Sequence, residues 1–154
     1  MYDGTLSGYV PVWNSGFCGV RAARGHFVVR DREQRLRDAA AGFATEVAGY
    51  TGLPADKCSG MTLDAIPDDQ KGTFDRILIM RMMHNINRWN IADSELKAMR
   101  ELLKDDGLVG IEQHRAKADA PYSYTDGGKG YMREADVIKM MEINGFELVG
   151  KSEV

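Results

Sequence analysis

One stretch of the sequence constrains the fold more than any other. Residues 74–83 read FDRILIMRMM and are nearly continuously apolar, broken only by Asp75, Arg76 and Arg81. The length of the run and its β-branched residues favour a buried strand. Strands that are apolar on both faces are typical of parallel sheets covered by helices. We therefore predict a buried strand here, within an α/β fold.

The segments that follow this strand alternate between helix and strand patterns. A polar loop is expected at 84–90, then a helix capped by Asp93 or Ser94 and ended by Gly107 in a left-handed conformation. Beyond it we predict a strand at 108–111, a polar loop at 115–130, a helix at 133–143 and a last strand at 146–149. This order predicts a mostly parallel sheet with flanking helices. The apolar helix positions are Leu96, Met99, Leu102 and Leu103, and then Val137, Ile138, Met140 and Met141.

The first half of the chain gives weaker patterns. Short strands are expected at 8–13, where Pro11 favours an edge or a strand end, at 26–30 and at 58–63. A helix is expected at 32–47, with Asp31 as a candidate cap. Neither an internal repeat nor a domain linker is evident, so we expect residues 1–154 to form a single domain.

Size and composition limit the function. The chain has 154 residues and a net charge of −3, which suits one soluble domain and does not favour nucleic-acid binding. Neither a membrane-spanning run nor a signal peptide is evident, so a cytoplasmic protein is expected. Cys18 and Cys58 lack metal-ligand spacing and are interpreted as reduced thiols, although a disulfide between them stays open. The three histidines are far apart in sequence, so no metal site is expected.

Three segments carry a family resemblance. Phe74–Ile79 followed by Met83-His84-Asn85 is similar to the fourth strand of class I S-adenosylmethionine-dependent methyltransferases, and residues 101–109 (ELLKDDGLV) to the turn before their fifth strand. The most specific match joins residues 112–116 (EQHRA), 130–138 (GYMREADVI) and 144–153 (NGFELVGKSE), which resemble a group of bacterial predicted methyltransferases. The matches cover about half the chain, from Phe74 onward.

The resemblance implies a partial Rossmann-like methyltransferase sheet, S-adenosylmethionine as cofactor and a small molecule as methyl acceptor. It places Asp64, with Ala65, where the family contacts the adenine amino group of the cofactor. It also matches Tyr131 and Arg133 to a family motif at the start of the last helix, which implies a role on the substrate side.

The sequence departs from the family at the glycine-rich cofactor loop, for which residues 14–19 (NSGFCG) are the nearest candidate. Two registers are open. In the one we favour, residues 4–11 correspond to the family's second strand, and the chain starts after the loop. In the other, Gly16 and Gly19 form a degenerate loop, and Asp31 is the acid that binds the ribose. The chain is also expected to lack the family's last antiparallel strand.

The candidate site lies where the predicted strands end. His84 and His114 follow neighbouring strands, and ligands of open α/β sheets bind beyond the carboxyl ends of strands. Either histidine can serve as a general base near neutral pH. Arg115 can grip a carboxylate or phosphate of the substrate, or it can form a structural ion pair with Glu112 or Glu134. Tyr131, Arg133 and Glu134 can equally belong to the start of a helix.

Two functions follow. The first is methyl transfer from S-adenosylmethionine to a small molecule, with His84 or His114 as the base. The alternative is a non-catalytic methyltransferase-fold module that self-associates, as a homo-oligomer, or binds a partner, because missing outer elements would expose sheet edges.

Overall fold

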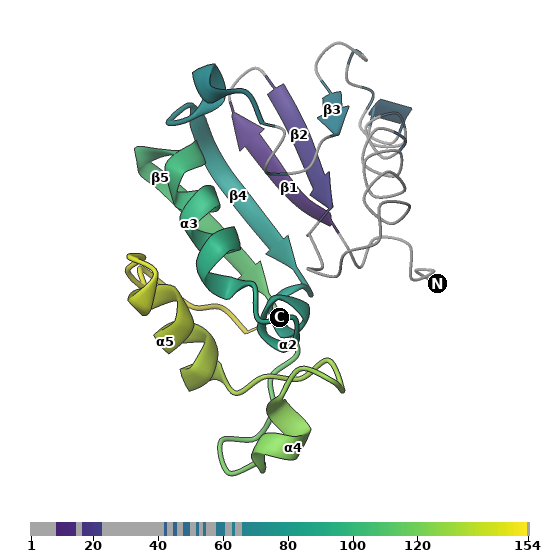
Figure 1. The fold of residues 1–154 in the computed structure, drawn as a ribbon. Coiled ribbons are helices and arrows are strands. Elements are labelled where there is room, and N and C mark those ends of the chain that lie inside the picture. Colours follow the sequence, from purple (N-terminus) through teal and green to yellow (C-terminus); the bar gives the residue numbers. More distant parts are fainter. Residues whose placement is uncertain are drawn as a thin grey trace.

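The computed structural model describes residues 9–14, 17–22, 42, 45, 48, 49, 52, 54, 58–60, 63 and 66–153. Their central element is a five-stranded sheet with the strand order β3-β2-β1-β4-β5 (Figure 1). The strands are β1 (Tyr9–Asn14), β2 (Phe17–Ala22), β3 (Cys58–Gly60), β4 (Phe74–Met80) and β5 (Leu103–Glu112). The helices are α2 (Met83–Arg88), α3 (Ala92–Leu102), α4 (Tyr122–Thr125) and α5 (Glu134–Ile143), with a short 3-10 turn at Asp68–Gln70.

The sheet is mixed, which corrects the prediction of a mostly parallel one. β4 and β5 are parallel, as are β2 and β3, whereas β1 is antiparallel to both of its neighbours, β2 and β4. Strand β2 was not predicted. It forms a hairpin with β1, in which Asn14 is the register partner of Phe17. The α/β class and the parallel pair β4/β5 with helices beside it are confirmed.

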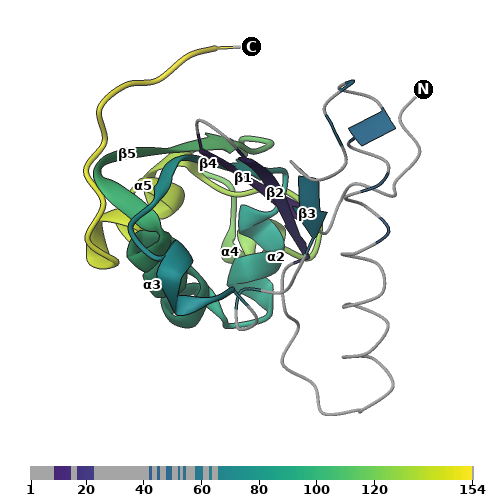
Figure 2. The same cartoon turned by 90° about the horizontal axis from the view of Figure 1, so that it is seen from above.

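The core lies between β4 and the helices that follow it. Ile77 and Ile79, two residues apart, lie on one face of β4 and are buried, as is Phe74, whereas Arg76 and Met80 are exposed. Figure 2 shows α2 and α3 on the same side of the sheet. The strand therefore alternates between buried and exposed positions instead of being apolar on both faces. The other buried members of the core are Met82, Met83, Ile86, Ile91, Leu96, Met99, Leu102 and Met132.

Helix α3 joins β4 to β5 and confirms most of its predicted stripe. Leu96, Met99 and Leu102 are buried, but Leu103 already belongs to β5. The predicted cap was wrong, because the helix begins after Ile91, and the Ser94 hydroxyl donates to the Ile91 carbonyl. Helix α5 confirms the prediction at 133–143, although Val137, Met140 and Met141 pack on the core while only partly buried.

The turn expected at Gly107 is an irregularity within β5. Phe74 pairs with Leu103 and Arg76 with Leu108, so residues 104–107 lie opposite Asp75 alone. Across this bulge the Lys104 ammonium forms an ion pair with the Asp75 carboxylate at 2.6 Å. Gly107 is needed because a Cβ would come within 2.8 Å of the Leu103 side chain, and not because of a left-handed backbone. Bulges of this kind redirect a strand without ending it.

The remaining predicted segments differ from the structure in part or lie outside the described residues. Residues 84–90 are largely helical, in α2, and residues 146–149 form no strand. The strand predicted at 58–63 is confirmed for Cys58–Gly60, and β1 begins one residue later than expected. The strand predicted at 26–30 lies outside the described residues, as does most of the helix predicted at 32–47.

Candidate functional site

The candidate site lies at the carboxyl ends of β4 and β5. Because the two strands are parallel, the residues that follow them meet at one edge of the sheet. His84 stands in the first turn of α2, four residues after β4, and Gln113, His114 and Arg115 follow β5 directly. Arg81, between β4 and α2, has a φ of 53° and donates its backbone N–H to the Glu112 carbonyl at 2.7 Å. A non-glycine residue with this backbone angle is uncommon and often stands near a functional site.

Gln113 connects the two strand ends. Its Oε1 accepts from the His84 backbone N–H at 3.3 Å and lies 3.2 Å from the His84 Nδ1. Its Nε2 donates to the Gly130 carbonyl at 2.7 Å. The amide therefore has a donor group on its oxygen side and a carbonyl on its nitrogen side, which fixes its orientation.

This orientation fixes the tautomer of His84. An amide oxygen can only accept, so Nδ1 carries the proton that lies toward Gln113. In the neutral ring Nε2 is then left with its lone pair. Burial lowers the pKa of His84 below its usual range, and the positive charges of Arg88 and Arg81 lower it as well. The hydrogen bond that His84 donates to Gln113 raises this pKa, but by less than burial lowers it. At neutral pH the ring is an uncharged base.

The 115–130 segment folds over this site and is held by backbone contacts. Ala116 N–H donates to the Met132 carbonyl at 2.8 Å, and Met132 N–H to the His114 carbonyl at 3.2 Å. Gly127 is buried, with a φ of 95°, and a Cβ there would lie 2.2 Å from the His84 carbonyl oxygen. The Asn87 amide donates to the Asp126 carbonyl at 3.2 Å. The segment is therefore packed directly on α2.

Three aromatic rings, those of His114, Tyr131 and Tyr124, lie in a row at the end of β5. The ring centroids of His114 and Tyr131 are 5.6 Å apart, and those of Tyr131 and Tyr124 are 5.5 Å apart. The ammonium of Lys129 lies over the Tyr124 ring, 4.9 Å from its centroid. All four side chains are at least partly open to solvent. The row extends the site from the end of β5 onto α4.

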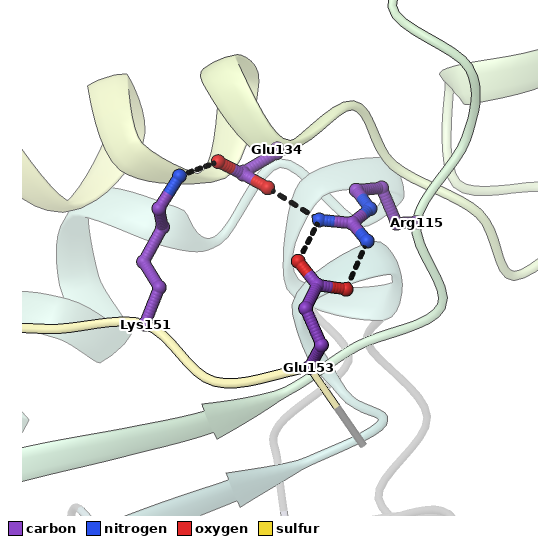
Figure 3. Close-up of polar contacts among 4 residues, drawn as sticks. All are labelled: Arg115, Glu134, Lys151 and Glu153. Carbon is purple, nitrogen blue, oxygen red and sulfur yellow. Dashed lines mark hydrogen bonds and ion pairs between the residues drawn. The ribbon is translucent and has the colours of Figure 1, made fainter.

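Arg115 is held in an ion-pair network (Figure 3). Its guanidinium contacts the Glu134 carboxylate at 2.7 Å and binds both oxygens of Glu153, while Lys151 contacts Glu134 at 2.5 Å. The network ties the end of the chain to the start of α5. Of the two partners expected for Arg115, Glu134 is present, and Glu153 is an addition that the sequence did not indicate.

Arg133 holds the 115–130 segment by contacts with its backbone. Its Nε and Nη2 donate to the Ala120 carbonyl at 3.0 and 2.8 Å, and its Nη1 lies 3.3 Å from the Asp136 carboxylate. The guanidinium is thus occupied by contacts that shape the loop. Through these contacts Arg133 positions the loop at the border of the site.

The structure places five of the residues expected from the sequence around the carboxyl ends of β4 and β5. These are His84, His114, Arg115, Tyr131 and Arg133. The expected cofactor residues Gly16, Asp31, Asp64 and Ala65 lie outside the described residues. Around Gly16, β1 and β2 form an antiparallel hairpin, which differs from the strand-to-helix turn that a glycine-rich cofactor loop makes.

Sequence reasoning missed Gln113, Tyr124 and Lys129. Gln113 carries no charge, and only its place between two predicted site residues in the fold reveals it. Tyr124 and Lys129 stand in a segment predicted as a polar loop. The presence of Tyr122, Tyr124 and Tyr131 in an otherwise polar stretch was the available signal.

Comparisons with known proteins add no assignment. The chain matches no protein-family model, and searches of curated proteins and of solved structures found no similar protein. Within the described part of the chain, no group of three or more His, Cys, Asp or Glu side chains can hold a metal ion. No helix of that part is long and apolar enough to cross a membrane.

Proposed function

We propose that this chain is a methyltransferase-like enzyme that transfers a methyl group from S-adenosylmethionine to a small molecule, on a Rossmann-like sheet. The observation that carries the proposal is the pairing of His84 with Gln113 at the carboxyl ends of two parallel strands. The motifs around residues 74–85, 101–116 and 130–153, which resemble methyltransferases, surround this point. Ligands of open α/β sheets bind at such strand ends.

His84 would act as the general base. Gln113 holds the Nδ1 proton, so Nε2 is the atom that takes a proton from the acceptor. The lowered pKa of His84 keeps the ring neutral near pH 7, which a base requires. S-adenosylmethionine would supply the methyl group, and the residues expected to hold it lie outside the described part of the chain. The proposal therefore rests on the acceptor side of the site.

The test is a methyl-transfer assay with labelled S-adenosylmethionine and a panel of small hydroxyl and amine acceptors. His84→Ala should lower turnover by about 100-fold or more, as loss of a general base does. His114→Ala is the matched comparison, because it removes the second histidine at the same edge. An active preparation whose turnover neither substitution changes would contradict the proposed chemistry.

A second candidate function is self-association, and the edge of the sheet favours it. β5 is the last strand of the sheet in the described part of the chain, and Leu108 on it is 42% exposed. Leu148 and Val149 are also exposed, across a groove of about 960 Å³ that β5, α5 and residues 145–153 line. Open edges and apolar surfaces of this kind favour association. Size-exclusion chromatography with light scattering tests it, and a stable monomer at high concentration counts against it.

A further inference from the structure

The row of rings beside His84 indicates what the site binds. Tyr124 and Tyr131 are 36% and 37% exposed, although aromatic side chains of this size usually contribute to a core. Neither belongs to the core cluster, and their contacts with each other and with His114 do not remove them from solvent. Adjoining exposed rings mark binding surfaces, because their faces can stack on a planar ligand.

Lys129 puts a positive charge at this surface. Its ammonium lies over the Tyr124 ring, and among the described residues no carboxylate forms an ion pair with it. Arg81 and Arg88 act on the charge of His84 at the neighbouring strand end. The Asp126 carboxylate accepts from the Gly128 backbone N–H at 2.8 Å. An anionic group on a bound ligand would therefore meet the Lys129 ammonium.

Contacts of Gln113 and Gly127 hold the backbone of this surface in place. The Gln113 amide joins the His84 ring to the Gly130 carbonyl, one residue before Tyr131. The packing of Gly127 against the His84 carbonyl fixes the segment that carries Tyr124 and Lys129. The segment that carries the rings is thus linked to the base through Gln113 and Gly127, and a ligand on the rings would lie on the His84 side of the site.

We propose that His114, Tyr131, Tyr124 and Lys129 form a subsite for a planar aromatic anion, such as a hydroxylated aromatic carboxylate. As a statement about the acceptor it rests on the proposed function, but as a binding site it does not require methyl transfer. A planar ring stacks on the row, and Lys129 contacts the negative group. The hydroxyl of such a ligand is the type of group that His84 can deprotonate.

The experiment is a titration of the full chain with 4-hydroxybenzoate in the absence of any methyl donor, followed by calorimetry and saturation-transfer NMR. The comparison ligand is trans-4-hydroxycyclohexanecarboxylate, which carries the same groups on a saturated, non-planar ring. We expect saturable binding of the aromatic ligand and at least about fivefold weaker binding of the saturated one, the difference that aromatic stacking typically makes. Equal binding of the two ligands, or no saturable binding of 4-hydroxybenzoate, would overturn the proposal.

Substitutions locate the binding. Tyr131→Leu and, separately, Tyr124→Leu should each weaken binding of 4-hydroxybenzoate by about fivefold. Tyr122→Leu is the matched control on the same short helix, because Tyr122 is 72% exposed and lies outside the row. Tyr131→Phe keeps the ring and should keep the affinity, which separates loss of the ring from loss of the hydroxyl. Binding that Tyr122→Leu weakens as much as Tyr124→Leu does would contradict the subsite.

The two proposals can fail separately. Binding of 4-hydroxybenzoate without methyl transfer would support the subsite and count against the proposed enzyme. Methyl transfer to non-aromatic acceptors alone, unaffected by Tyr124→Leu, would support the enzyme and overturn the subsite as the place where the acceptor binds.

Discussion

Gln113 fixes the protonated nitrogen of His84. The amide oxygen lies 3.2 Å from Nδ1, and the amide nitrogen is committed to the Gly130 carbonyl. A side chain without charge therefore decides which ring nitrogen of the histidine can accept a proton. This relationship can be measured without knowing any substrate.

The pKa of His84 should be below 6.5 in the folded protein, because burial is the largest influence on it. Gln113→Leu removes the hydrogen bond that raises this pKa and should lower it further. Gln113→Glu puts a negative charge at the same place and should raise it. NMR titration of the ring protons, with His84→Gln used for assignment, measures all three. Shifts of the two variants in the same direction would contradict the contact.

The same pKa sets the sign of a pH effect. His84 takes up a proton less readily in the folded chain than in the unfolded one. Between the folded pKa and about 6.5 the unfolded state binds more protons, so the contribution of His84 to stability rises with pH there. Any turnover that uses His84 as the base should also rise with pH through the folded pKa and level off near neutrality. A rate that falls with increasing pH over this range would exclude His84 as the base.

Gly127→Ala should destabilise the protein more than Gly130→Ala does. Both glycines have a positive φ, which costs an alanine about 1–2 kcal/mol. A Cβ at Gly130 meets open space, whereas one at Gly127 would overlap the His84 carbonyl. We expect a further loss of about 1–3 kcal/mol for Gly127→Ala, the usual cost of overpacking. Urea unfolding of both variants measures the difference, and equal losses would mean that the segment does not pack on α2.

Arg115→Met should release the end of the chain. The guanidinium is the only contact shown between Glu153 and the start of α5 in the described part of the chain, and Lys151 would be left to hold Glu134 alone. The NMR order parameters of residues 146–153 should fall, while the unfolding temperature changes little, because exposed ion pairs contribute modestly. Lys139→Met is the control, since it breaks an exposed pair with Glu142 inside α5. Unchanged order parameters in Arg115→Met would contradict the role of the network.

Acid should release the same segment. The neighbouring cations lower the pKa values of Glu134 and Glu153. A carboxylate with a lowered folded pKa stabilises the fold above its unfolded value and loses that contribution as pH falls through the folded value. The NMR order parameters of residues 146–153 should therefore fall as the pH drops below about 4.5. They should fall less in Arg115→Met, where the contact is already absent.

The sequence predicted the elements whose apolar pattern reflects burial. β4 was recognisable from its isoleucines, and α3 and α5 from their spaced leucines and methionines. Helix α2 was missed because Asn85 and Asn87 suggest a loop, although the Asn85 side chain is buried and contacts the Met82 sulfur at 3.3 Å. These contacts are set by the tertiary fold and leave no periodic signal.

The two errors around β5 have physical causes. Residues 104–107 (KDDG) read as a turn, but they form a bulge in an edge strand, where exposed Asp105 and Asp106 are tolerated. The strand expected at 146–149 does not form because, in the described part of the chain, no strand pairs with it, and the groove separates it from β5. Strand formation depends on a partner that a local pattern does not reveal.

The candidate site was predictable in part. The histidines and Arg115 follow from the rule that polar residues at strand ends form sites, and the structure places them at one edge. The aromatic row depends on how the 115–130 segment folds back, which Gly127 and the Arg133 contact with Ala120 determine. Nothing in the spacing of Tyr124, Tyr131 and His114 along the chain fixes that geometry.

Methyl transfer at this site requires the chain to bind the spent cofactor, so this binding tests the proposed function most directly. Isothermal titration calorimetry of the full chain with S-adenosylhomocysteine, on a sample whose fold is checked by circular dichroism, should give saturable binding in the micromolar range. A folded protein that binds nothing at millimolar concentration would contradict the account and favour the self-associating module.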